Sequence, residues 1–564
     1  MENKEYMLID GNPVEINGEK NLLEVIRKAG IELPTFCYHS ELSVYGACRM
    51  CMVENSHGCM EAACSTVPKA GMEIYTNTER LHKHRKMILE LLLANHCRDC
   101  TTCQKNGKCR LQELASLFGL ESIRFKNLKP EPELDTSSLS IIRDAHKCIL
   151  CGDCVRMCNE IQNVGAIDFV NRGSKMVIGP AFNEPIANSP CVGCGQCAAV
   201  CPTGAIVIRK DTGRVWPELN DKNTKVVAQV APAVRVAMAK EFGLPENENS
   251  MGRITAALRR LGFDEVYDTA TGADLTVLEE SNEFLQRIEA GENLPLITSC
   301  CPAWIQYCEK NHPELMKNIS TCKSPMQMFS SVIKAKYSTS SRRVVCVAVM
   351  PCTAKKFECA REEFMHDGVP ETDYVITTQE LIQMIHKAGI VFDELEPEAV
   401  DSVFSTCTGA GVIFGVTGGV TEAVLRRLST DKSNKALMSI AFNDVRGMKG
   451  VKETTIPYGD KEVRIAIVSG LKNAEKVIQA LKNGEHFDFI EVMACPGGCV
   501  AGGGQPFGTN ATKEVRGKAL YSADKMLSIK RSEENPLMLS LYDGVLKGRV
   551  HELLHVHYNH KEEE

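Results

Sequence analysis

Runs of closely spaced cysteines constrain this chain more than any other feature of its sequence. Cys148, Cys151, Cys154 and Cys158 follow the spacing C-x2-C-x2-C-x3-C, and the same spacing recurs from Cys191 to Cys201. Small secreted disulfide domains scatter their cysteines in pairs, whereas thiolates in tight runs are typical ligands of iron or zinc. The 27 cysteines therefore favour metal sites in a reducing compartment, and disulfides are the weaker interpretation.

The repeated run resembles that of bacterial two-cluster ferredoxins, in which the fourth cysteine of each copy binds the cluster of the other copy. Zinc would not require two matched runs. The resemblance predicts a 2[4Fe–4S] ferredoxin domain over residues 140–212. Its first cluster would be held by Cys148, Cys151, Cys154 and Cys201, and its second by Cys191, Cys194, Cys197 and Cys158.

The amino-terminal region predicts a small β-grasp domain over residues 1–80. Tyr6 to Ile9 and Pro13 to Ile16 are strand-like runs on either side of a turn, and Asn21 to Ala29 has helical periodicity. Four cysteines follow, at positions 37, 48, 51 and 64. Their order resembles the [2Fe–2S] ferredoxin domains at the amino ends of hydrogenases and respiratory-complex subunits, with Cys37, Cys48, Cys51 and Cys64 as ligands. A zinc site is the alternative.

A second small domain is predicted over residues 81–126. Leu81 to Asn95 has the pattern of a helix, and a histidine and three cysteines follow it with the spacing H-x3-C-x2-C-x5-C. In the same two protein families such a set holds a [4Fe–4S] cluster with one imidazole ligand. The ligands here would be His96, Cys100, Cys103 and Cys109. A zinc Cys3His site remains the alternative, and Cys97 competes with His96. The proline-rich stretch from Asn127 to Ser140 is expected to be a linker.

From Lys225 onward, cysteines become sparse and apolar strands alternate with helix-like segments, among them Val226 to Val230, Val344 to Val349 and Arg464 to Val468. This pattern predicts a two-lobed α/β domain. Three cysteine-bearing loops follow apolar strands in it: TSCCPAW, PCTAKK and ACPGGCV. They resemble the three signature motifs of the [FeFe]-hydrogenases, and the resemblance assigns residues 213–564 to the catalytic domain with a carboxyl-terminal tail. The fold class is multidomain, α+β and α/β.

The resemblance implies an H-cluster, which is a [4Fe–4S] cubane joined to a diiron subcluster with CO, CN and azadithiolate ligands. Its cysteine ligands would be Cys301, Cys352, Cys495 and Cys499. The implied chemistry is heterolytic, H2 ⇌ 2H⁺ + 2e⁻. The implied proton route comprises Cys300, Glu280, Ser320, Glu283 and Arg287. Residues expected around the diiron site are Lys355, Ser324, Met350, Met493, Pro232 and Phe414.

The chain departs from well-known members of that family at three positions near the expected diiron site. Met326 replaces a usual glutamine, Ala233 a usual serine and Ala303 a usual glycine. Each change removes a polar or flexible element. Catalytic bias and oxygen tolerance therefore do not transfer from those members to this chain.

Composition limits the partners. A net charge of −7 gives no basic footprint for nucleic acid or an anionic membrane, and no stretch approaches the roughly 20 apolar residues of a membrane span. We expect a cytoplasmic, monomeric hydrogenase that exchanges electrons with a soluble ferredoxin or flavodoxin and depends on maturases. It would carry one [2Fe–2S] cluster, three accessory [4Fe–4S] clusters and the H-cluster.

Three alternative functions fit the sequence less well than a hydrogenase. A non-catalytic respiratory-type iron–sulfur subunit would need no pair like Cys300 and Cys301, and a low-turnover hydrogen sensor usually carries a signalling domain that is not visible here. The stretch from His551 to His555 matches the HExxH pattern of zinc proteases. Little sequence follows it, and the chain shows no substrate-cleft domain, so a protease is disfavoured.

Overall fold

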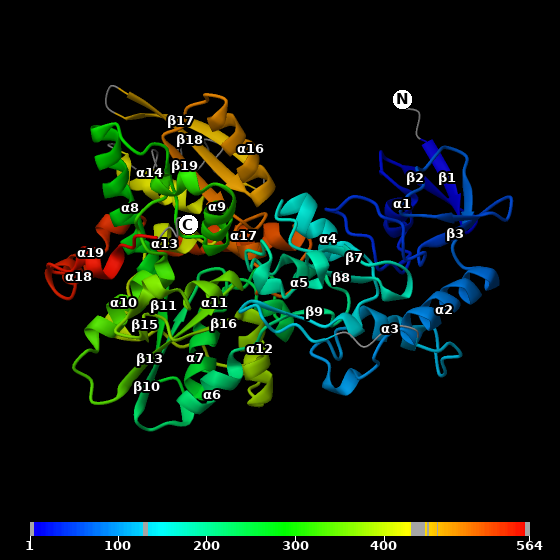
Figure 1. The fold of residues 1–564 in the computed structure, drawn as a ribbon, viewed down its shortest axis with the longest axis horizontal. Coiled ribbons are helices and arrows are strands. Elements are labelled where there is room, and N and C mark those ends of the chain that lie inside the picture. Colours follow the sequence, from blue (N-terminus) through cyan, green and yellow to red (C-terminus); the bar gives the residue numbers. More distant parts are fainter. Residues whose placement is uncertain (1–4, 128–132, 430–445, 448–449, 459–460, 559–564) are drawn as a thin grey trace.

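The chain forms an elongated molecule of three successive parts. The computed structural model describes residues 5–127, 133–429, 446–447, 450–458 and 461–558. In Figure 1 the amino-terminal part (blue) lies at one end of the long axis, a compact part around residues 140–210 (cyan) lies in the middle, and the largest part lies at the other end. Helices and strands occur in all three, which confirms a multidomain, mixed α/β chain.

The first part is built on a five-stranded sheet with the order β2-β1-β5-β3-β4. The helix α1 (Leu22–Lys28) packs on it. In β1, Met7 and Ile9 are buried between exposed neighbours, the alternation of a half-buried strand. The strands are β1 (Glu5–Ile9), β2 (Asn12–Ile16), β3 (Met52–Asn55), β4 (Met60–Ala62) and β5 (Glu73–Tyr75). The two predicted strands and the predicted helix are confirmed.

Helices α2 (Glu79–Ala94) and α3 (Arg110–Leu117) follow, joined by the loop that carries His96 and Cys97 to Cys109. The side chain of Thr78 accepts a hydrogen bond from the Leu81 amide and caps α2. The predicted helix from Leu81 to Asn95 is confirmed, with its start two residues earlier.

The middle part holds the repeated cysteine run in loops that lead into short helices. Gly152 and Gly195 have φ of 76° and 70° and precede α4 (Asp153–Arg156) and α5 (Gln196–Val200). This left-handed backbone is open to glycine at little cost. Two small antiparallel ladders complete the part, β6 (Ile141–Arg143) with β9 (Ile206–Ile208), and β7 (Asp168–Val170) with β8 (Val177–Gly179).

The linker prediction is wrong for the segment that leads into β6. The Asp135 amide and carbonyl both pair with Arg143, and the Asp135 carboxylate accepts a hydrogen bond from the Ile186 amide at 2.9 Å. The segment is polar because its side chains bond to this domain. Residues 128–132 of the predicted linker lie outside the described residues.

The largest part contains two four-stranded sheets. In the first, β11-β10-β13-β16, all neighbours are parallel. In the second, β12-β19-β18-β17, only β17 runs antiparallel. The strands are β10 (Thr224–Val230), β11 (Glu265–Asp268), β12 (Leu296–Ile297), β13 (Arg343–Met350), β16 (Tyr374–Thr377), β17 (Val451–Tyr458), β18 (Lys461–Ser469) and β19 (Phe489–Met493). The three strands predicted here are confirmed, and their nearly continuous apolar runs reflect burial on both faces.

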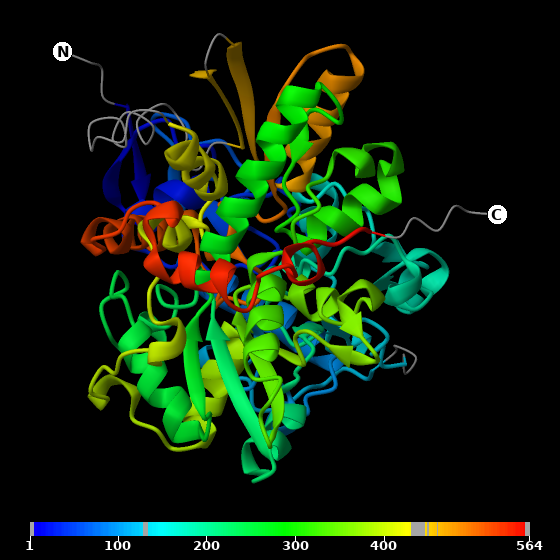
Figure 2. The same cartoon turned by 90° about the vertical axis from the view of Figure 1, so that its left-hand side faces the viewer.

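The two sheets are joined by α8 (Ala270–Ala290), the long helix between β11 and β12. The carboxyl-terminal helices α17 (Asn510–Met526), α18 (Pro536–Asp543) and α19 (Val550–Leu554) return to this joint, and Figure 2 shows the red segment crossing between the two sheets. There the backbone of Val556 donates to the Thr321 carbonyl at 2.7 Å. Among the described residues no helix combines the length and the apolarity needed to cross a bilayer.

Candidate functional site

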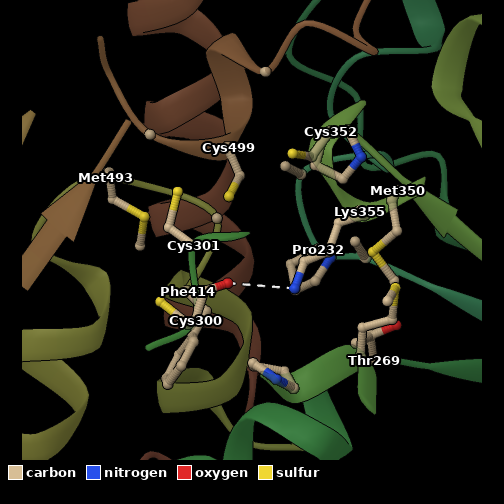
Figure 3. A pocket seen from close by; sticks show the side chains of 18 of the residues that line it. Pro232, Thr269, Cys300, Cys301, Met350, Cys352, Lys355, Phe414, Met493 and Cys499 are labelled. Atoms are coloured by element: carbon tan, nitrogen blue, oxygen red, sulfur yellow. Dashed lines mark hydrogen bonds between the residues drawn. The ribbon is translucent and has the colours of Figure 1, made fainter. Parts of the chain in front are cut away.

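An almost wholly apolar cavity lies where the carboxyl ends of the parallel strands from both sheets meet. Ligand sites of open α/β sheets form at such edges. The loops after β10, β11, β12, β13 and β19 all supply wall residues. Figure 3 shows Cys301 and Cys499 on one side and Cys352 on the other. The predicted residues that line the cavity are Pro232, Cys300, Cys301, Met350, Cys352, Lys355, Phe414, Met493, Cys495 and Cys499.

Glycines let the cysteine-bearing loop after β19 approach its neighbours backbone to backbone. A Cβ at Gly502 would clash with the Pro351 carbonyl, next to Cys352, and a Cβ at Gly503 would clash with the Cys194 carbonyl of the middle part. Gly498 has φ of 83° and lies against the Thr417 amide. The glycines therefore bring Cys499 close to the other thiols and the cavity close to the middle part.

The lining of this apolar cavity includes one cationic side chain, that of Lys355. Burial alone would lower the pKa of Lys355, but the Glu358 carboxylate, 2.6 Å from its Nζ, raises the pKa above its usual value. The ammonium also donates to the Cys300 carbonyl at 3.3 Å, the dashed line in Figure 3. The cavity thus contains a fixed positive charge beside its thiols.

The residues of the predicted proton route lie in sequence from the cavity outward. Burial, and next the charge of Glu280, raise the pKa of the Cys300 thiol well above its usual value. Burial raises the pKa of Glu280 to about 8, with the Glu283 carboxylate adding to the rise. Ser320 donates to Glu283 at 2.7 Å, whereas neither carboxyl oxygen of Glu280 has a hydrogen-bond partner among the described residues.

The outer end of the route is ionic and reaches the surface. Glu283 and Arg287 are 2.6 Å apart with side chains 11% and 12% exposed, whereas Glu280 is fully buried. The Arg287 guanidinium is held by the carbonyls of Asn318 and Ile319. These residues therefore extend from a fully buried carboxyl at Glu280 to a partly buried ion pair between Glu283 and Arg287.

Ser324 differs from its prediction. It is fully buried, but it is not one of the residues lining the cavity, because its hydroxyl caps helix α10 (Pro325–Lys336) by accepting from the Gln327 amide. Its neighbours Pro325 and Met326 line the wall instead. Sequence reasoning also missed Thr269, which follows β11 and faces the cavity. A threonine at a strand end carried no motif that would have found it.

The departures from the family pattern fall at the cavity or beside it. Ala233 and Met326 line the wall, and Ala303 is buried in α9 (Pro302–Asn311) directly after the Cys301 loop. The Ala233 carbonyl accepts from the Gln505 amide at 2.9 Å. The wall is therefore more apolar here than serine and glutamine would make it.

The middle part gathers its cysteines in two groups around two further cavities. Cys148, Cys151, Cys154 and Cys201 line the first, and Cys158, Cys191, Cys194 and Cys197 line the second. The fourth cysteine of each run thus lies with the other run, the exchange that the spacing predicts. The second group approaches the catalytic cavity, since Gln196 donates to the Cys495 thiol at 3.2 Å.

The thiols of the first part lie in two pairs. The side chains of Cys37 and Cys48 share a hydrogen bond, and so do those of Cys51 and Cys64. These hydrogen bonds raise the pKa of Cys37 and Cys64 and lower the pKa of Cys48 and Cys51. Two irons that each take two cysteines fit this pairing. The pairs therefore fit a [2Fe–2S] cluster better than one zinc ion surrounded by four equivalent ligands.

In the next loop, Cys100, Cys103 and Cys109 lie within electrostatic reach of one another. His96 is buried at the end of α2, and its Nδ1 accepts from the Arg98 amide at 3.1 Å. Cys97 lies beside it, with its sulfur 4.0 Å from that nitrogen. The structure places the three cysteines together and leaves His96 and Cys97 as neighbouring candidates for the fourth ligand.

The arrangement of the thiols fits clusters rather than single ions or disulfides. All 27 cysteines are free. Within the part of the chain that the structure describes, no three His, Cys, Asp or Glu side chains are gathered closely enough to hold one metal ion. Zinc would need four donors about 2.0–2.3 Å from a single centre. Cysteines spread around shared cavities fit the corners of iron–sulfur clusters, and His551 and His555 gather no third such ligand among the described residues.

This fold and these sites define an iron–sulfur oxidoreductase with a buried catalytic cavity. Family models agree along the chain. Residues 6–79 match a 2Fe-2S iron-sulfur cluster binding domain, 85–124 the NADH-ubiquinone oxidoreductase-G iron-sulfur binding region and 147–208 a 4Fe-4S dicluster domain. Residues 224–503 match the iron only hydrogenase large subunit, C-terminal domain, and 510–561 the iron hydrogenase small subunit.

Relatives cover nearly all of the chain. It is 41% identical to the NADP-reducing hydrogenase subunit HndD of Solidesulfovibrio fructosivorans over 98% of both chains, and 35% identical to iron hydrogenase 1 of Clostridium pasteurianum over 98% of this chain and 99% of that one. A solved variant of the [FeFe]-hydrogenase HydA1 from Chlamydomonas reinhardtii is 37% identical with a TM-score of 0.54, covering 62% of this chain and 98% of its own.

The chain therefore belongs to the [FeFe]-hydrogenase family. It catalyses H2 oxidation and proton reduction at an H-cluster and carries accessory iron–sulfur clusters of the 2Fe–2S and 4Fe–4S types.

Proposed function

We propose that this hydrogenase exchanges electrons with a soluble ferredoxin or flavodoxin through one [2Fe–2S] and three accessory [4Fe–4S] clusters. The observation that carries the proposal is the gathering of every predicted cluster cysteine around a cavity or into a close group, in an order that leads to the catalytic cavity. Four domains follow, over residues 1–80, 81–126, 140–212 and 213–564. The setting we propose is cytoplasmic and the oligomeric state monomeric.

The catalytic cavity would hold the H-cluster on Cys301, Cys352, Cys495 and Cys499. When bound, this group supplies the site at which H2 is cleaved into protons and electrons. Lys355 offers a compact ammonium donor to the anionic cyanide ligands, and Pro232, Met350, Phe414 and Met493 keep water away from the cavity. Ser324 remains a proposed donor to a second cyanide, because its hydroxyl only accepts in the cap of α10 and its O–H stays available.

Protons would pass between the cavity and solvent along Cys300, Glu280, Ser320, Glu283 and Arg287. A raised pKa lets Glu280 hold a proton near neutral pH, as a group that both gives and takes protons requires. The Ser320 hydroxyl donates to Glu283 and would turn toward Glu280 to pass a proton between the two carboxyl groups. Arg287 pairs with Glu283 at the outer end and holds its carboxylate in place.

Electrons would enter at the amino-terminal end of the molecule. One hydrophobic core contains Cys37 and Cys151, and Cys48 and Cys109 pack against it. Residues of three accessory sites therefore meet there. A Cβ at Gly204 would lie 2.7 Å from the Cys103 sulfur, which brings the His96 loop against the middle part. From there the two cysteine groups of the middle part lead to Cys495.

The loop around Cys100 and Cys103 is the surface we assign to the carrier. Arg98 and Lys108 are exposed on it and Lys105 is partly exposed, with Asp99 as the only acidic side chain between Cys97 and Arg110. Lys108 pairs with Glu241 at 2.5 Å, so Arg98 and Lys105 supply the positive charge that suits a small acidic protein such as ferredoxin or flavodoxin.

A partner subunit is the second candidate for the electron carrier. The relative from Solidesulfovibrio fructosivorans is named as a subunit of an NADP-reducing hydrogenase and matches this chain from end to end. We therefore propose NADP(H) reached through another subunit as the alternative. Purified chain that exchanges electrons with NADPH only after a partner subunit is added, and that does not react with ferredoxin alone, would favour this alternative.

The deciding experiment is an infrared spectrum of protein produced anaerobically with the hydrogenase maturases. Bands from metal-bound CO and CN are expected, together with H2-dependent reduction of ferredoxin. Absence of the bands, in a preparation whose accessory clusters are filled and whose maturases load a known hydrogenase in parallel, would overturn the H-cluster assignment in this chain.

A further inference from the structure

Gln196 connects the middle part of the molecule directly to the catalytic cavity. It opens α5 and precedes Cys197, so its backbone belongs to the second cysteine group. Its side chain points the other way. The amide Nε2 lies 3.2 Å from the Cys495 sulfur and 2.9 Å from the Ala501 carbonyl oxygen.

Both hydrogens of this amide have an acceptor in the loop after β19. The side chain is almost wholly buried, at 7% exposure, so water does not compete for them. The distance between α5 and the loop after β19 is also set by the backbone, because Gly503 packs against Cys194 and Gly195. The N–H to sulfur contact is therefore a built feature of the interface between the two parts.

A hydrogen bond to a cysteine ligand favours the more reduced, more negative state of a cluster. Such bonds to sulfur are among the features that set the reduction potentials of iron–sulfur clusters. In the described residues, Gln196 is the one side chain that donates from nitrogen to a thiol of the catalytic cavity. Backbone amides also act on these thiols, among them that of Ala494, which donates to Cys301 at 3.5 Å.

We propose that Gln196 is a positioning residue that raises the reduction potential of the cubane by donating a hydrogen bond to Cys495. The inference rests on the assignment of Cys495 as a cubane ligand under the proposed function. Gln196 would thereby connect the cubane ligand Cys495 with the neighbouring cluster, whose ligand Cys197 follows it in the chain.

The test is a redox titration of the full-length, matured protein followed by the infrared bands of CO and CN, which report the oxidation state of the H-cluster alone. Gln196→Leu keeps the bulk and removes the donor, so the cubane midpoint should shift to a lower potential. Gln196→Glu adds an acceptor charge and should shift it further in the same direction. The matched control is Gln306→Leu, a glutamine of equal burial on α9 that makes no bond to a cluster thiol, and it should titrate as wild type.

Unchanged midpoints in both Gln196 variants, or a shift equal to that of Gln306→Leu, would overturn the inference. Loss of the cubane from both variants would also overturn it, because the role would then be structural. These outcomes differ from failure of the proposed function, in which wild-type protein itself would show no CO or CN bands. A shift confined to the Gln196 variants, with bands present in every sample, supports the inference.

Discussion

At the scale of single residues, Glu280 is the member of the proposed proton route whose protonation carries the clearest prediction. A carboxyl with a pKa of about 8 is protonated at neutral pH and can donate toward the cavity. Proton reduction should therefore fall as the pH rises through about 8. Glu280→Gln should lower turnover by roughly 10²- to 10⁴-fold, the usual contribution of a positioned acid or base. The rate of H2 production, measured from neutral to alkaline pH, tests both the fall with pH and the loss of turnover in the variant.

The same residue links pH to stability with a definite sign. The folded protein holds a proton on Glu280 that the unfolded chain releases at ordinary carboxyl pKa, so folding stability falls as pH rises between that value and about 8. Glu280→Gln removes this loss. The melting temperature of the variant should rise relative to that of wild type as the pH increases over this window. An equal pH dependence of the melting temperature in both proteins would refute the assigned pKa.

Cys300 is predicted to act in proton transfer and not in cluster binding. Its replacement by alanine should retain iron and the infrared bands while turnover falls by roughly 10²- to 10⁴-fold. The control is Cys308→Ala, a buried cysteine on α9 whose sulfur bonds to the His312 carbonyl, and it should stay active. Wild-type turnover in Cys300→Ala would remove the first member of the route.

At the scale of elements, the glycine-rich loop after β19 is an interface. Gly503→Ala would force a Cβ against the Cys194 carbonyl, and overpacking of this kind costs about 1–3 kcal/mol. The variant should unfold at a lower temperature and lose iron from the second cysteine group. Gly213→Ala is the control, because a Cβ there meets nothing within 4 Å and the site is helical. Equal melting temperatures would contradict the contact.

These elements also show where sequence reasoning succeeded and where it could not. The exchange of Cys158 and Cys201 between the two groups followed from the resemblance of the repeated spacing to bacterial two-cluster ferredoxins. Gln196 and Gly503 could not be found in that way, since their partners lie about 300 residues away and only the folded chain joins them. Ser324 carried a signal that went unused: serine before proline is a typical helix start, and the structure uses it as one.

At the scale of the whole molecule, the basic loop at the amino-terminal end is predicted to receive an acidic carrier. The double variant Arg98→Glu and Lys105→Glu should lower kcat/KM for ferredoxin and weaken its salt dependence, because surface electrostatics act on encounter. Activity with a small viologen dye should not change. Lys476→Glu, on the distant helix α16 (Leu471–Lys482), is the control. Equal losses in the two proteins would place the docking surface elsewhere.

The pairing of residues 554–556 with Thr321 and Lys323 has a consequence for synthesis. The Lys323 amide donates to Leu554 and the Val556 amide donates to Thr321, on either side of Cys322 and next to Ser320 of the proton route. A ribosome delivers every cluster cysteine of this chain, the last being Cys499, more than fifty residues before it delivers Leu554. All the cluster cysteines can thus be synthesised while the segment from Thr321 to Lys323 still lacks its backbone partners at residues 554–556. Synthesis therefore completes the set of cysteines before it completes the backbone pairing beside Ser320.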